Sequence, residues 1–275
     1  MLGTIAASNK LHGGSTLRAF VSIVTFIVLW EFGSRSKELL GFPLPWIGIV
    51  PPPSKIGVAW LSLLSDPGYW QSWYLSFYRV LGGFTIAMLL GIPLGLTLAM
   101  NRNFKSIVLP VIEILRPIPP LAWVPLSIVF WPTQELSITF VTFLGAFFTV
   151  VINVLGGAKA IDRRYLDMTR SLGFSKWDTF KRVVLPATLP SIVMGASVGM
   201  GITWEVVVAA EMISGGGGST GGNGGGLGFF IWNSYNGGNY EAIVIGMISI
   251  GIAGYISSSL LRTFGGYLTP WLAKR

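Results

Sequence analysis

Residues 162–186 read DRRYLDMTRSLGFSKWDTFKRVVLP, a charged stretch in a chain that is otherwise strongly apolar. Seven of the 19 lysines and arginines fall between Lys159 and Arg182, and uncharged apolar runs flank the stretch on both sides. Charged side chains are costly in hydrocarbon, and basic residues gather in cytoplasmic loops. The sequence therefore predicts a cytoplasmic segment between two transmembrane helices.

The same stretch predicts two short helices separated by a glycine. Asp162 can cap the first helix, and Gly173 stands where a left-handed terminating glycine belongs. Ser175 and Asp178 form an S-x-x-D capping box for a second helix, which meets Pro186. The less polar side chains of the first helix fall roughly on one face, at Tyr165, Met168, Thr169 and Leu172. We interpret the pair as a docking element.

Composition places most of the remaining chain in a membrane. Of the 275 residues, 52% are hydrophobic and 11% are charged, and the mean hydropathy is +0.65, which is outside the range of soluble domains. A shorter candidate span, Leu17–Ser34, carries Glu31, and no small-x-small cleavage site follows it, so we expect a retained helix. Charge-free runs long enough to cross a bilayer lie at residues 80–100, 117–134, 136–158, 183–204 and 242–261.

The distribution of lysine and arginine predicts six helices with both chain termini in the cytoplasm. The expected organisation is a cytoplasmic tail at residues 1–16, one transmembrane domain at 17–264 and a second cytoplasmic tail at 265–275. Within the domain, the charged loop occupies residues 159–182 and a glycine-rich outer loop occupies 214–239. The net charge of +8 is then an orientation signal and an attraction to anionic lipid, and no nucleic acid is expected.

Residue types exclude several kinds of chemistry. Cysteine is absent and His12 is the only histidine, so disulfides, thiolate chemistry, histidine-based metal sites and Ser-His-Asp catalysis are not expected. Ten of the fourteen residues from Gly215 to Gly228 are glycine, and they contain a G-x-G-x-x-G match. The tract follows a membrane helix instead of a strand and lacks the Gly-Lys-Ser/Thr of a phosphate loop. We expect a flexible outer loop, and no metal or cofactor bound by this chain.

Prolines and charges inside apolar segments mark a candidate translocation path. Arg116 precedes a proline-rich run in the third segment, and broken backbone at membrane depth survives only when buried in protein or lining a cavity. Arg116 can pair with Glu113, contact a passing anion, or do both. Glu205 pairs either with Arg79 or with another buried group, or else it lines the path, whereas Glu211 is expected near the outer interface. The predicted path residues are Arg116, Glu113, Pro117, Pro119, Trp123 and Glu205.

Small residues predict close helix packing. Gly91 and Gly95 are four residues apart, as are Gly195 and Gly199. Pairs at this spacing let two helix backbones approach each other in a membrane.

The charged stretch resembles the cytoplasmic coupling loop of ABC importer permeases, which follows the pattern E-A-A-x-x-x-G, nine residues and I-x-L-P. The residues that match, with conservative replacements at four positions, are Asp167, Met168, Thr169, Gly173, Val183, Leu185 and Pro186. The resemblance implies that separate ATPase subunits dock here. It implies a coupling role for Arg163, Arg164, Asp167, Gly173, Phe174, Trp177 and Pro186.

Further landmarks look like the nitrate, sulfonate and taurine permease group of ABC importers. They are residues 51–54 (PPPS), 78–84 (YRVLGGF), 91–95 (GIPLG), 116–123 and 209–212 (AAEM). Residues 228–236 are most similar to the cyanobacterial nitrate and bicarbonate branch. The resemblance implies an all-α, type I ABC importer permease in the bacterial inner membrane, with coupling helices between the fourth and fifth spans.

The same resemblance implies a function and partners. The expected substrate is a small inorganic anion, nitrate with nitrite first, and bicarbonate or sulfonates such as taurine as alternatives. Expected partners are a second permease copy, two subunits that bind ATP and Mg²⁺, an external binding protein and membrane lipid. A different class stays open: an ion-coupled secondary transporter that uses Glu113, Glu205 or Glu211 as a proton carrier.

Overall fold

The computed structural model describes residues 2–214 and 225–271, with side chains from residue 17 onward. The described residues form helices and turns, without a β-strand among them. They divide into two compact units. One unit holds the chain up to Asp66 together with Ser234–Ile245, and the other holds Pro67–Asn233 and the chain from Gly246 onward.

The first unit is organised by the carboxylate of Glu31. Glu31 lies near the end of the first long helix, where its Oε2 accepts a hydrogen bond from the backbone N–H of Ser54 at 3.0 Å. Its Oε1 pairs with Nε of Arg35 at 2.5 Å. The charge within the first predicted span therefore fixes the start of a later helix. The helices of this unit are α1 (Leu2–Ser34), α2 (Ser36–Leu40), the 3₁₀ turn η1 (Ile47–Ile49) and α3 (Pro53–Leu63).

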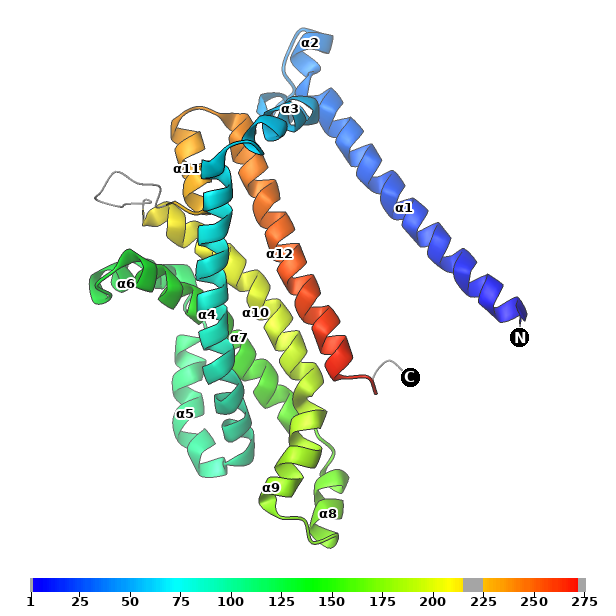
Figure 1. The fold of residues 1–275 in the computed structure, drawn as a ribbon, viewed down its shortest axis with the longest axis vertical. Helices are drawn as coiled ribbons and strands as arrows, with labels where there is room; N and C mark the ends of the chain where they lie inside the picture. Colours follow the sequence, from blue (N-terminus) through cyan, green and yellow to red (C-terminus); the bar gives the residue numbers. More distant parts are fainter. Residues whose placement is uncertain (1, 215–224, 272–275) are drawn as a thin grey trace. The chain divides into compact units, whose positions relative to one another are not determined.

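The second unit is built around three long helices that lie side by side, with α7 between α4 and α10 (Figure 1). Their bounds are Pro67–Met100 for α4, Gln134–Lys159 for α7 and Leu185–Ile213 for α10. The predicted packing glycines are confirmed. A Cβ on Gly95 would come within 2.9 Å of the carbonyl oxygen of Val151, and a Cβ on Gly195 would come within 2.7 Å of Cβ of Asn153. Larger residues would force these backbones apart.

The third apolar run is broken at its prolines, as predicted, so the span expected at 117–134 is not one straight helix. Prolines and Arg116 separate two segments that are bent by 88°. They are α5 (Arg102–Leu115) on one side and the 3₁₀ turn η2 (Pro120–Trp123) with α6 (Val124–Phe130) on the other. Within the described residues, five helices are long and apolar enough to span a membrane, and the bent pair makes up to six, in agreement with the predicted number.

The charged loop contains α8 (Arg163–Ser171) and α9 (Lys176–Thr179). The second helix does not end before Pro186, as the capping pattern had suggested. It continues through a π-helical turn, η3 (Phe180–Val184), into α10, so Pro186 lies inside a continuous helical run. Proline has no N–H to donate to the preceding turn, and the π-helical turn stands directly before it. The helical run therefore extends from Lys176 to Ser214.

The predicted glycine-rich loop at 214–239 contains a helix in its second half, α11 (Leu227–Asn236). Residues 215–224, the greater part of the glycine tract, lie outside the described residues, so the expectation of a flexible loop is untested there. The last helix, α12 (Tyr240–Leu268), extends past the predicted domain end at residue 264.

Candidate functional site

The predicted caps of the charged loop are confirmed. Asp162 Oδ1 accepts a hydrogen bond from the N–H of Arg164 at 2.9 Å, and Ser175 Oγ accepts one from the N–H of Asp178 at 3.1 Å. Gly173 has φ +74°, a conformation that side-chain-bearing residues rarely adopt. These local contacts fix the angle between α8 and α9.

The predicted coupling residues lie on an exposed surface. Trp177 is 68% exposed and stacks on Phe180 with ring centroids 5.4 Å apart. Phe174 lies 5.5 Å from the guanidinium carbon of Arg182. Exposed apolar side chains beside charged ones suit a protein partner. Of the predicted coupling residues, those exposed to solvent are Arg163, Arg164, Asp167, Gly173 and Trp177.

One predicted detail of α8 is wrong. Tyr165, Met168 and Leu172 are exposed, but Thr169 is buried, and its hydroxyl lies 3.3 Å from that of Thr179. Thr169 therefore holds α8 against α9, and only the other three side chains are available to a partner. Tyr165, Arg182 and Pro186 also line a hollow of about 280 Å³.

The predicted path residues around Arg116 lie at the bend between α5 and α6. Arg116, Glu113, Pro117 and Pro119 are exposed, and Trp123 is half-buried. Among the ion pairs of the described residues, none joins Glu113 to Arg116, so the structural pair between them is not formed.

Instead, Glu113 lines a hollow on α5 together with Arg102 and Lys105. Because none of the ion pairs of the described residues involves Arg116, this side chain is a cation without a carboxylate partner within the described chain.

Glu205 does not pair with Arg79, which settles one of the open alternatives. It is exposed and lines a groove of about 450 Å³ between α10 and α12, with Tyr255, Ser258 and Arg262. An exposed carboxylate within a membrane-spanning helix must face water or protein, since lipid would not accommodate it. Its place in a translocation path stays a prediction.

The partners of Arg79 are Glu211 and Glu135. The Arg79 side chain is 1% exposed, and the Glu211 side chain is fully buried. Nη1 of Arg79 donates to Oε1 of Glu211 at 2.9 Å, and Nε donates to Oε2 of Glu135 at 2.8 Å. Nη2 of Arg79 also binds the Glu135 carboxylate. The expectation that Glu211 reaches the membrane interface is therefore wrong.

The carboxylate of Glu211 also fixes the start of α11. It accepts hydrogen bonds from the Ser76 hydroxyl and from the N–H of Gly228, both at 2.9 Å. Ser76 Oγ in turn accepts from the N–H of Leu227 at 2.8 Å. We call Ser76, Arg79, Glu135 and Glu211 the arginine network. Sequence reasoning noted Arg79 and Glu211 separately, but it gave no signal that joined them.

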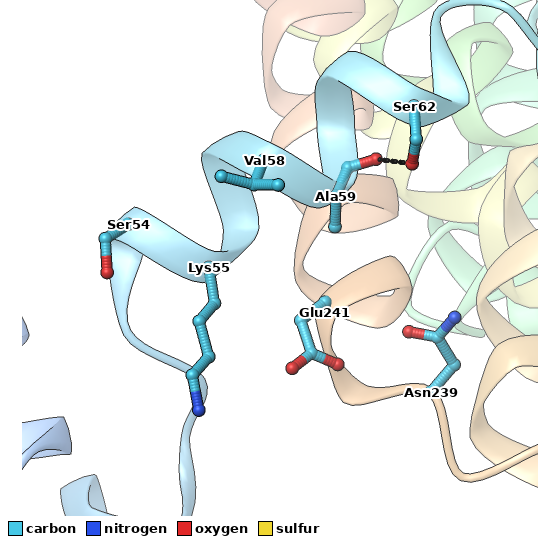
Figure 2. A pocket seen from close by; sticks show the side chains of 7 residues that line it. All are labelled: Ser54, Lys55, Val58, Ala59, Ser62, Asn239 and Glu241. Atoms are coloured by element: carbon cyan, nitrogen blue, oxygen red, sulfur yellow. Dashed lines mark hydrogen bonds between the residues drawn. The ribbon is translucent and has the colours of Figure 1, made fainter.

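The first unit contains a hollow of about 610 Å³ between α3 and the start of α12 (Figure 2). Lys55 of α3 and Glu241 of α12 both extend toward it, and Asn239 lies at its edge. It holds none of the predicted path residues. No group of three or more histidine, aspartate or glutamate side chains that could bind a metal occurs in the residues for which the structure gives side chains.

Comparison with known proteins gives consistent matches. A family model described as binding-protein-dependent transport system inner membrane component matches residues 91–274. The bicarbonate transport system permease protein CmpB of Synechococcus elongatus is 34% identical over 284 residues, covering 97% of this chain and 92% of that protein. The nitrate import permease protein NrtB of Synechocystis sp. is 34% identical over 262 residues, covering 94% and 92%.

A solved structure shares the fold. It is the MetNI methionine ABC transporter in an inward-facing conformation, which matches with a TM-score of 0.56 and 22% identity, covering 73% of this chain and 94% of that chain.

Proposed function

Because this chain belongs to the family of binding-protein-dependent transport system inner membrane components, we propose that it is the permease of an importer for small inorganic anions, nitrate and nitrite first. The chain is an ABC importer permease and a multi-pass protein of the bacterial inner membrane. ATP hydrolysis belongs to two separate subunits that bind ATP with Mg²⁺, and an external protein delivers the anion. A second copy of the chain completes the pore.

The observation that carries the anion proposal is the state of Arg116. It is exposed at a break between helices and has no ion-pair partner in the described chain. A permanent positive charge in such a position offsets the cost of moving an anion through a low-dielectric region. Relatives of this chain are named for nitrate, bicarbonate and taurine, and each of these three compounds carries an oxygen-rich anionic group. Bicarbonate is the second candidate substrate, supported by the match to CmpB along 97% of this chain.

The continuous helix from α9 into α10 supports a mechanism for coupling. Closure of the ATPase subunits around α8 and α9 would displace Lys176, and the helical run ending at Ser214 would transmit that displacement. The same run carries Glu205 and Glu211. A rigid element that joins the docking surface to the membrane core can switch access to a central cavity. This mechanism places the charged loop in the cytoplasm, where the ATPase subunits bind.

Trp177→Ala tests the docking role. Trp177 is 68% exposed, so its removal leaves the fold of the permease intact. We expect roughly 30-fold weaker binding of the ATPase subunits, the effect of losing an interface tryptophan worth about 2 kcal/mol. Gly173→Val, which places a β-branched residue at φ +74°, should reduce co-purification as well. Ser171→Ala is the matched control on the same surface. Normal co-purification and uptake in both variants would refute the docking assignment.

A further inference from the structure

A small cavity lies where α6, the start of α7 and the end of α10 meet. Its volume is about 180 Å³. Trp131 follows α6, Thr133 and Gln134 begin α7, and Ser214 follows α10. The cavity is separate from Arg116, Glu205 and the charged loop, and the predicted path does not include it.

Two hydrogen-bond donors that line this cavity have no partner among the residues that the structure describes. They are Nε1 of Trp131 and Oγ of Ser214, and both atoms are buried. Buried polar groups are nearly always hydrogen-bonded, so a buried donor without a partner points to an occupant. The indole N–H can only donate. The occupant must therefore present an acceptor to Trp131.

The other polar side chains that line the cavity are those of Thr133, Gln134 and Ser137, which carry oxygens that can accept as well as groups that donate, and none of them is a carboxylate. The amide nitrogen of Gln134 donates one hydrogen to the carbonyl of Ser214 at 3.1 Å, which leaves its second hydrogen available. Thr133 caps α7, so the cavity also lies at the positive end of a 26-residue helix. The nearest carboxylate in sequence, Glu135, is bound by Arg79.

These contacts select a chemical class. Nitrate and nitrite carry acceptor oxygens and no hydrogen, so they match the donors left over at Trp131, Ser214 and Gln134. Taurine carries an ammonium group, which would need a carboxylate that the cavity lacks. At about 30 Å³ per water, 180 Å³ accommodates one such anion with water. We propose that the cavity is a binding site for a small anion that only accepts hydrogen bonds, nitrate or nitrite.

Uncharged donors hold the anion loosely, which suits a site that an ion occupies before moving on. The choice of nitrate rests on the proposed function, whereas the donor lining stands on the geometry alone. Uptake of nitrate by the reconstituted importer tests the first, and a direct measurement at Trp131 tests the second.

The test is ¹⁹F NMR of the full chain with its ATPase subunits, labelled with 5-fluorotryptophan and titrated with sodium nitrate. The Trp131 resonance is assigned by its loss in Trp131→Phe. We expect it to shift saturably with nitrate, and not with taurine at equal concentration. Ser214→Ala should weaken the apparent Kd about fivefold, the effect of one hydrogen bond.

Trp73→Phe is the matched control, because Nε1 of Trp73 is also buried without a partner but does not line the cavity. It should leave the Kd measured at Trp131 unchanged. A Trp131 resonance that ignores nitrate, an equal response to taurine, or an unchanged Kd in Ser214→Ala overturns the proposal. Nitrate uptake without a response at Trp131 would overturn only this site, and absent nitrate uptake would overturn the proposed substrate.

Discussion

Two arginines in the membrane-spanning part of this chain have opposite surroundings. Arg79 is 1% exposed, and two glutamates from other helices occupy its guanidinium. Arg116 is exposed at a bend of the backbone, and no carboxylate pairs with it in the described residues. Both side chains are permanently charged, yet only that of Arg116 is left without a carboxylate and can interact with an anion from outside the chain.

The difference separates structure from transport. In the arginine network, Nε, Nη1 and Nη2 of Arg79 all donate to carboxylates, so this residue cannot attract a passing anion. The network instead joins α4, α7 and α10 and holds the start of α11. A charge within a membrane protein is therefore evidence for a path only after its partners are known.

The largest expected effect is that of Arg79→Met. It leaves Glu211 buried without its counter-charge, and breaking a buried pair in this way costs about 3–5 kcal/mol. We expect the purified permease to lose most of its yield and to unfold at a clearly lower temperature, measured by fluorescence-detected size-exclusion chromatography after heating.

Glu211→Gln is the internal comparison for that experiment. Arg79 keeps Glu135 as its partner in this variant, so the loss of thermal stability should be smaller than in Arg79→Met. Equal stability of Arg79→Met and the wild type would show that the network does not support the fold.

A smaller effect on the fold, but a severe one on transport, is expected for Arg116→Gln. The substitution removes the charge at an exposed position, so assembly and basal ATP hydrolysis should persist. Uptake of nitrate should fall at least about tenfold, because the lost attraction is worth roughly 1.4 kcal/mol or more. Arg116→Lys should recover part of that loss by restoring the charge without the planar fork.

Transport by Arg116→Gln at the wild-type rate would place the anion path elsewhere. If the Arg116→Gln and Arg79→Met variants had the same thermal stability, the distinction between a structural Arg79 and an Arg116 that serves transport would not hold.

Local patterns predicted the charged loop well. Asp162, Gly173 and Ser175 act within a few residues of themselves, so short-range rules were sufficient to place them. The arginine network could not be predicted in this way, since Arg79 lies 56 residues from Glu135 and 132 from Glu211. Only the packing of three helices brings these side chains together.

Two other features also depended on tertiary structure. Proline at 186 is typical of a helix boundary, but the π-helical turn before it keeps α9 and α10 continuous. By contrast, the packing role of the paired glycines at 91 and 95 was predictable, because their spacing alone defines a packing face. The exposed position of Glu205 in the groove between α10 and α12 likewise has no signal in the sequence.

The most direct test of the central claim, an anion importer driven by separate ATPase subunits, is reconstituted uptake. Proteoliposomes would contain this chain with its ATPase subunits, enclosed ATP and Mg²⁺, and nitrate-loaded binding protein outside. We expect nitrate uptake that requires ATP, is blocked by vanadate and is unaffected by a protonophore. Nitrate uptake that proceeds without ATP and collapses with the proton gradient would contradict the account.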